Sequence, residues 1–375
     1  MNLFPYLRSL GQSIWLDEVT PATVSSGALG AAIRERAVGG ARLRPSMEGS
    51  LDEDFPDRLL ERHPDASGYE LYEAVLLQAA RDAADAFLAL YEESRGQQGF
   101  LSLGLAPGLA FNSGDLIEEA ERVWEAVGRP NLMIEVPATA DGNVAMETLL
   151  IRGIHVNATC LFSPAQYEAS AATYVQALEN SCRPEAVSSR ATFEVGRLDV
   201  AADRALARLG TDRVSDLRGR IGVASGLVVL RLFERFAEAS PAPEGGTPAH
   251  CLVYGQRGIR REGGHVQRIL WDCARAGGVP SPRCLEALAA PATGTCLSSG
   301  MLKRLEEAAI EGGPPSVTAS EEAVDTLAEV RELGVDLDAL ADELQAETNL
   351  ERDRSLRRLA SALDAKRNAL FRSAA

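Results

Sequence analysis

The stretch that decides the fold is residues 131–163, NLMIEVPATADGNVAMETLLIRGIHVNATCLFS. It begins and ends with short apolar runs, at residues 131–137 and 155–162, which are typical of strands. Between them, residues 145–153 carry apolar side chains at three- and four-residue spacing, as an amphipathic helix does. A strand, a helix and a second strand in this order predict parallel α/β architecture.

The same alternation extends along the chain in both directions. Strands are predicted at residues 13–17, 37–43, 100–105, 131–137, 155–162, 192–198, 251–255 and 289–297. Helices with apolar periodicity are predicted between them, at residues 70–93, 113–128, 145–153, 164–180 and 219–239. Eight strands that alternate with helices predict a (β/α)8 TIM barrel at about residues 13–310. We expect one α/β barrel domain over residues 1–375, with extra N- and C-terminal helices.

C-terminal helices are predicted at about residues 320–372, and the tail at residues 332–371 predicts two of them. One face of the last helix carries Leu356, Leu359, Leu363 and Leu370. We expect this face to cover the outside of the barrel. A leucine stripe is also typical of a seam between two subunits, so both a monomer and a homodimer remain open. The Pro- and Gly-rich residues 238–247 predict a loop within the barrel and not a domain boundary.

The composition excludes several classes of partner. A formal net charge of −16 and a pI near 4.9 argue against nucleic acid and anionic membranes, because both are bound by basic surfaces. Neither a long apolar run nor a signal-peptide pattern occurs, and the six cysteines lack CxxC spacing. We therefore expect a cytoplasmic protein. Since no nucleotide-binding glycine motif and no metal-like histidine pairing occur, no cofactor and no metal are expected.

Polar residues fall at the ends of the predicted strands, where barrel enzymes carry their chemistry. Four of them are Asp17, Asn157, Thr159 and Arg197. Structural roles are also open, since Asp17 can cap the next segment and Arg197 can form an ordinary ion pair. The cluster nevertheless favours a ligand-binding cavity, because apolar side chains would suffice for stability at these positions. His265 is the one histidine for which we consider a catalytic role.

These motifs resemble those of the transaldolase family, in particular the actinobacterial type, from SIWLDEV at residues 13–19 to GVDLDALADELQAE at residues 334–347. The resemblance implies a barrel enzyme in which a lysine, in a stretch like NLMIKIPAT, forms a Schiff base with the substrate. Glu135 stands at that position in NLMIEVPAT. A carboxylate has no nitrogen to condense with a carbonyl, so imine chemistry is closed there. The chain has two lysines, Lys303 and Lys366, both in predicted late helices.

The resemblance also assigns roles to other residues. Asp17 matches a carboxylate for proton transfer, and Asn157 and Thr159 match the family's fifth-strand pattern. In GGARLRPS, Arg44 replaces a substrate-binding asparagine, and in SLGL, Gly104 replaces a glutamate that positions the catalytic water.

The anion site that the resemblance implies is partly kept. In TFEVGRLD, Arg197 matches a phosphate-binding arginine and Thr192 stands for a serine. In the seventh-strand region, Arg257 or Arg260 could supply a second phosphate contact. The expected ligand is therefore a small anionic or polyol molecule.

Two functions remain open from the sequence. In the first, a repurposed enzyme uses Asp17 and Glu135 as an acid/base pair on a sugar-phosphate-like or polyol-derived substrate, in a specialised biosynthetic pathway. In the second, a catalytically inactive pseudoenzyme keeps the barrel as a binding or scaffold module. We expect Arg44 to pair with Glu135, because a partly buried carboxylate without a partner is costly. Schiff-base transaldolase activity is not expected.

Overall fold

The computed structural model describes residues 2–36, 38–43, 65–105, 107–210, 214–238, 265–274, 280–308, 310 and 317–373. Eight parallel strands close into a barrel in the order in which they occur along the chain. They are β1 (Ser13–Val19), β2 (Val38–Leu43), β3 (Phe100–Gly104), β4 (Leu132–Pro137), β5 (Val156–Leu161), β6 (Ser189–Phe193), β7 (Arg268–Asp272) and β8 (Gly294–Leu297). The predicted (β/α)8 barrel is confirmed.

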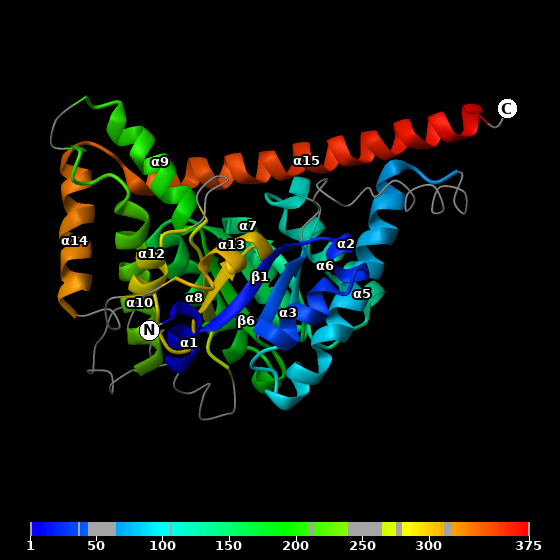
Figure 1. Cartoon of the computed structure of the whole chain (residues 1–375), viewed down its shortest axis with the longest axis horizontal. Helices are drawn as coiled ribbons and strands as arrows, with labels where there is room; N and C mark the ends of the chain where they lie inside the picture. The colour runs from blue at the N-terminus through cyan, green and yellow to red at the C-terminus, as the bar shows by residue number, and fades with distance from the viewer. Residues whose placement is uncertain are drawn as a thin grey trace.

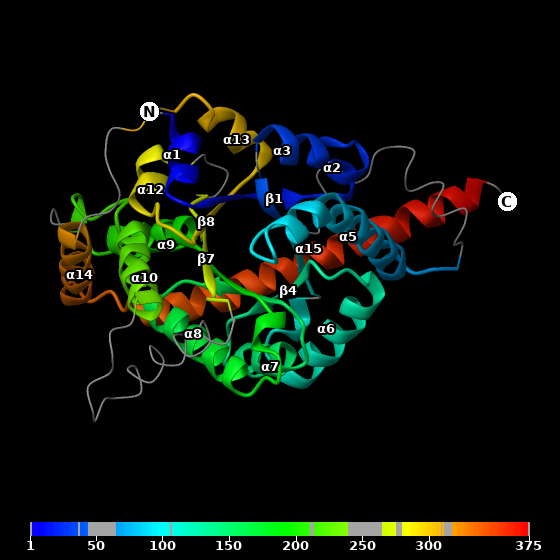
Figure 2. The same ribbon diagram turned by 90° about the horizontal axis from the view of Figure 1, so that it is seen from below.

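Helices surround this barrel (Figures 1 and 2). Those before, between and directly after the strands are α1 (Leu3–Ser9), α2 (Pro21–Ser25), α3 (Ala28–Arg36), α5 (Gly68–Glu93), α6 (Ser113–Val127), α7 (Ala140–Ile151), α8 (Pro164–Glu179), α9 (Val195–Ala207), α10 (Ile221–Glu238), α12 (Pro282–Ala287) and α13 (Ser299–Leu305). Two short 3-10 helices are η1 (Pro107–Leu109) and η2 (Pro184–Ala186). The C-terminal helices are α14 (Val317–Glu332) and α15 (Leu337–Ser373). The prediction of two helices within residues 332–371 is wrong, because residues 337–371 belong to the single helix α15. No helix in the described part of the chain is both long and apolar enough to span a membrane.

Local sequence signals explain where the helices begin. Ser67 caps α5, and Glu70 completes a capping box by accepting from the Ser67 backbone. Thr139 and Ser163 accept hydrogen bonds from the first turns of α7 and α8. Both caps directly follow strands, so the chain turns from strand to helix at the C-terminal end of the barrel.

Two predicted strands differ from the structure. The sixth strand is Ser189–Phe193, whereas the prediction placed it at residues 192–198. Residues 195–198 belong to α9, and over so short a length the apolar residues of a helix resemble those of a strand. The seventh strand is Arg268–Asp272. The predicted residues 251–255 lie outside the described residues. Because β7 begins at Arg268, His265 precedes this strand and lies at the end of the barrel opposite to the one expected.

Alternation along the strands builds the barrel interior in layers. Trp15, Phe100, Met133, Leu270 and Cys296 form one apolar cluster that is separate from the packing between strands and helices. The residues two positions further along the chain are polar in all five cases, and the four that lie within a strand, Asp17, Ser102, Glu135 and Asp272, form the next layer toward the C-terminal ends. The apolar layer therefore closes the barrel below the candidate site.

Helix α15 lies along the C-terminal ends of the strands and runs the length of the molecule (Figure 1). The Gln345 amide donates to the carbonyl oxygens of Ala138 and Cys160, both at 3.0 Å, where β4 and β5 end. Further along α15, Leu359 and Leu363 pack with Leu71 of α5. These leucines therefore cover the barrel assembly of their own chain, as we expected; the Leu370 side chain lies outside the described residues.

Buried His155 makes the fold sensitive to pH. Its Nδ1 accepts from the Ser188 N–H at 3.0 Å, and its Nε2 lies 3.0 Å from the Pro130 carbonyl oxygen. Burial lowers the pKa of His155 from 6.5 to about 4. Neutral His155 therefore stabilises the fold above pH 6.5, and this contribution is lost as the pH falls toward about 4, where the folded protein also takes up the proton.

We predict that acidification over this interval lowers the free energy of unfolding by about 3 kcal/mol through His155. Urea denaturation at a series of pH values measures this dependence. In a His155→Gln variant the decline should be smaller by that amount. Equal pH dependence in the two proteins would show that His155 is not the responsible group.

Candidate functional site

A buried ion pair between Arg42 and Glu135 lies at the centre of the polar layer. Arg42 on β2 has 0% exposure and Glu135 on β4 has 4%. The Arg42 Nε donates to Glu135 Oε1 at 2.9 Å. Burying two charges in this way is costly unless each is paired and hydrogen-bonded, so the contact fixes both side chains.

A chain of hydrogen bonds extends from Glu135 around the barrel. Ser102 on β3 donates its hydroxyl to Glu135 Oε1 at 3.0 Å, and the Asn157 amide on β5 donates to Ser102 Oγ at 3.0 Å. Thr192 on β6 donates to Asn157 Oδ1 at 2.8 Å. Each donor in this chain has one acceptor, so the orientation of the Asn157 amide follows from its neighbours.

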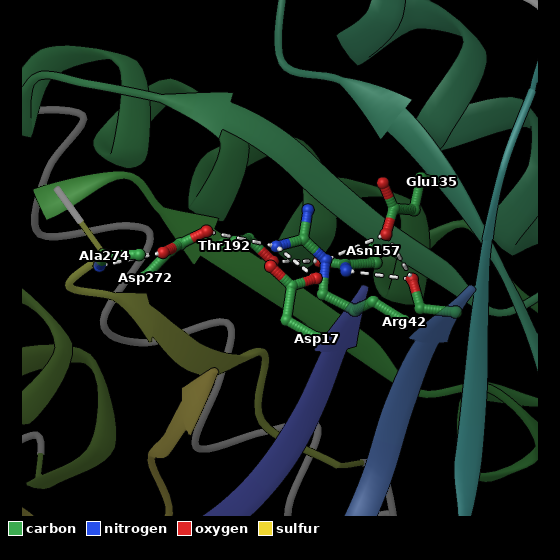
Figure 3. A network of polar contacts seen from close by, with 8 residues as sticks. Asp17, Arg42, Glu135, Asn157, Thr192, Asp272 and Ala274 are labelled. Carbon is green, nitrogen blue, oxygen red and sulfur yellow. Dashed lines mark hydrogen bonds and ion pairs between the residues drawn. The ribbon is translucent and has the colours of Figure 1, made fainter. Parts of the chain in front are cut away.

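Two further carboxylates approach the same guanidinium (Figure 3). Arg42 Nη1 lies 3.7 Å from Asp17 Oδ1 on β1 and 3.5 Å from Asp272 Oδ2 on β7. The other oxygen of Asp272 accepts from the Ala274 N–H at 3.1 Å. Carboxylates from three strands, β1, β4 and β7, therefore converge on one cation.

The charge of Arg42 depends on these neighbours. Burial lowers the pKa of Arg42, but Glu135 and Asp17 oppose this effect and the pKa ends well above its ordinary value. Its Nη1 and Nη2 atoms are buried and have no hydrogen-bond partner among the described residues. Buried donors are almost always paired. The Nη1 and Nη2 atoms of Arg42 could therefore donate hydrogen bonds to an oxygen of a ligand or of a water molecule.

The residues predicted from the sequence are partly brought together. Asp17, Glu135, Asn157 and Thr192 meet in this network, and Thr159 lies buried on β5 two residues beyond Asn157. Arg44, Arg257 and Arg260 lie outside the described residues. The partner of Glu135 that the structure describes is Arg42.

Arg197 lies apart from the network, on α9 and not on a strand. It donates to Glu351 of α15 at 2.7 Å and is about one-third exposed. Burial lowers the pKa of Arg197, but the hydrogen bond to Glu351 raises it above the usual value. A phosphate at this arginine would therefore have to compete with a carboxylate.

Sequence reasoning missed three residues of the site: Arg42, Ser102 and Asp272. The alternation of the strands could have identified the first two, since Arg42 and Ser102 each follow an inward-facing position by two residues. Asp272 could not be found in this way because its strand was not predicted.

No lysine belongs to a strand of the barrel. Lys303 is exposed on α13, and Lys366 lies on α15 near its C-terminal end. Within the described residues, no group of three or more His, Cys, Asp or Glu side chains is arranged to hold a metal ion. The described site is built from carboxylates, one guanidinium and uncharged polar groups.

Comparison of the sequence with known proteins identifies the family of this chain. Residues 14–363 match the family model described as transaldolase/fructose-6-phosphate aldolase. The chain belongs to this family. It is 35% identical to a transaldolase of Thiobacillus denitrificans over 358 residues, which cover 92% of this chain and 95% of the relative. It is 29% identical to a transaldolase of Parafrankia over 91% of each chain, and 30% identical to one of Mycobacterium tuberculosis over 71% of this chain and 70% of the relative.

We predict that Arg42 and Glu135 are strongly coupled in stability. Arg42→Met leaves three carboxylates without their shared cation and should lower the free energy of unfolding by about 3–5 kcal/mol. Glu135→Met should cost less, because Arg42 retains Asp17 and Asp272.

The double variant completes the test by urea denaturation. Its loss should be smaller than the sum of the two single losses by about 1–3 kcal/mol. Additive losses, or a larger loss for Glu135→Met, would contradict the arrangement described above.

Proposed function

We propose that this member of the transaldolase/fructose-6-phosphate aldolase family is an enzyme that moves protons on a polyol-derived substrate by carboxylate acid/base catalysis, without a Schiff base. Such chemistry fits a specialised biosynthetic pathway. The observation that carries the proposal is the convergence of Asp17, Glu135 and Asp272 on the buried guanidinium of Arg42.

The mixture of charges favours hydroxyl groups as ligands. A hydroxyl can donate to a carboxylate and accept from a guanidinium at the same time, whereas a phosphate at neutral pH chiefly accepts hydrogen bonds. A phosphate would meet three carboxylates around Arg42, and Glu351 already binds Arg197. A neutral polyol is therefore the better fit than a sugar phosphate.

The two oxygens of Glu135 differ in their surroundings. Oε1 accepts from both Arg42 and Ser102, and Oε2 lies 3.8 Å from where a β-carbon at position 104 would be. We assign Oε2 as the base that takes a proton from a substrate carbon next to a carbonyl. Asp17 or Asp272 in its protonated form gives a proton to the carbonyl oxygen, which yields an enediol. Glu135 then returns its proton to the former carbonyl carbon, while the aspartate takes back a proton from the hydroxyl of the neighbouring carbon, and this completes an isomerisation.

A second function is supported by the burial of the same pair. Arg42 is fully buried and Glu135 nearly so, and a filled interior fits a pseudoenzyme that serves as a binding or scaffold module. The two functions differ in whether any substrate proton exchanges.

Proton exchange with solvent provides the direct test. We expect the protein to catalyse deuterium incorporation from D2O next to the carbonyl of a ketose such as dihydroxyacetone or fructose, observed by proton NMR. Glu135→Gln should lower the rate by about 100-fold or more, because general-base catalysis contributes at least that much. Exchange that is unchanged in Glu135→Gln would exclude Glu135 as the base, and absence of exchange with every ketose would favour the pseudoenzyme.

Imine chemistry is tested separately. Treatment with borohydride and fructose 6-phosphate should give no covalent adduct in intact-protein mass spectra, since no barrel strand carries an amine. Glu135→Lys should not restore useful transaldolase turnover, because the new ammonium would lie beside Arg42 and opposite Gly104. An adduct on Lys303 or Lys366, or strong turnover in Glu135→Lys, would contradict the proposal.

A further inference from the structure

An apolar pocket lies beside the candidate site, where β3 ends between α5, α6 and α15. Its volume is about 170 Å³. Its walls include Leu76 and Leu77 of α5, Leu103 of β3, Val123 of α6 and Leu356 of α15. An apolar cavity of about 150 Å³ accommodates benzene, so this pocket has room for one six-membered ring.

One polar group in the wall has no described partner. Tyr72 lines the pocket, and its hydroxyl oxygen is buried without a hydrogen-bond partner among the described residues. Burial raises the pKa of Tyr72, so the phenol is protonated at neutral pH. A buried hydroxyl is normally paired, so Tyr72 favours a ligand with one polar atom on an otherwise apolar ring.

Acidic residues set the charge of this ligand. Glu70, Glu73 and Glu119 also line the pocket. Glu73 and Glu119 share Arg122 as their ion-pair partner. Three carboxylates against one arginine disfavour a ring that carries a negative charge.

Gly104 lies between the pocket and the candidate site. It lines the pocket, and its inward side faces Glu135, whose Oε2 lies 3.8 Å from the position of an added β-carbon. The pocket and the carboxylate therefore lie on either side of the last residue of β3.

We propose that this pocket is a substrate subsite for an uncharged six-membered ring with one hydroxyl or ether oxygen, attached to the polyol part that Glu135 acts on. This inference rests on the proposed function, since it names the second half of the same substrate. It predicts two separable properties: the pocket binds the ring alone, and a ring attached to a polyol binds through both parts.

The ring is tested with phenol, benzene and benzoate by ligand-observed NMR titration of the whole protein. Phenol should bind more tightly than benzene, and benzoate should bind weakest. Tyr72→Phe should lower the affinity for phenol by about three- to tenfold, which corresponds to the loss of one neutral hydrogen bond. The affinity for benzene should change by less than about twofold. If phenol does not bind, or binds the original protein and the Tyr72→Phe variant equally, the proposed subsite is overturned.

The link to Glu135 is tested with phenyl and methyl β-glucopyranoside. Leu77→Trp narrows the pocket and should lower the affinity for the phenyl glucoside by about tenfold, while the affinity for the methyl glucoside stays unchanged. Glu135→Gln should lower the affinity for both glucosides. If phenol binds but neither glucoside responds to Glu135→Gln, the proposed function fails together with the subsite. If the glucosides respond to Glu135→Gln but not to Leu77→Trp, only the subsite is overturned.

Discussion

The buried contact between Arg42 and Glu135 is the constraint on which the interior of this barrel depends. Neither charge can be removed from water alone without a large penalty, and the 2.9 Å contact from Nε to Oε1 offsets that penalty for both. The contact also determines its surroundings. Ser102 must donate to the same oxygen, Asn157 must donate to Ser102, and Thr192 completes the chain.

This constraint changes what the family's barrel can do. The family resemblance implies an amine on the fourth strand, and this chain has a carboxylate there, with its two lysines on helices. Asp17 and Asp272 add negative charge around the same guanidinium. An interior of this kind fits ligands that both donate and accept hydrogen bonds, and this fit is the basis of the acid/base function that we propose.

The sequence predicted the fold well because alternating strands and helices leave a clear periodic signal. It also singled out Glu135, Asp17, Asn157 and Thr192 as candidate site residues, and the structure brings these four together (Figure 3). It missed Arg42 because the choice rested on a motif match to Arg44 and not on the alternation of side chains along residues 38–43. It missed Asp272 because RILWD has three apolar residues between charged ones, a weaker strand signal than the apolar run at residues 251–255.

A crystal structure of the protein at atomic resolution tests the central claim most directly. We predict an ordered Arg42 guanidinium inside the barrel, with Nε bonded to Glu135 Oε1 and Nη1 between Asp17 and Asp272. A guanidinium turned out of the barrel, with Glu135 facing a different cation, would contradict the claim that this pair organises the site.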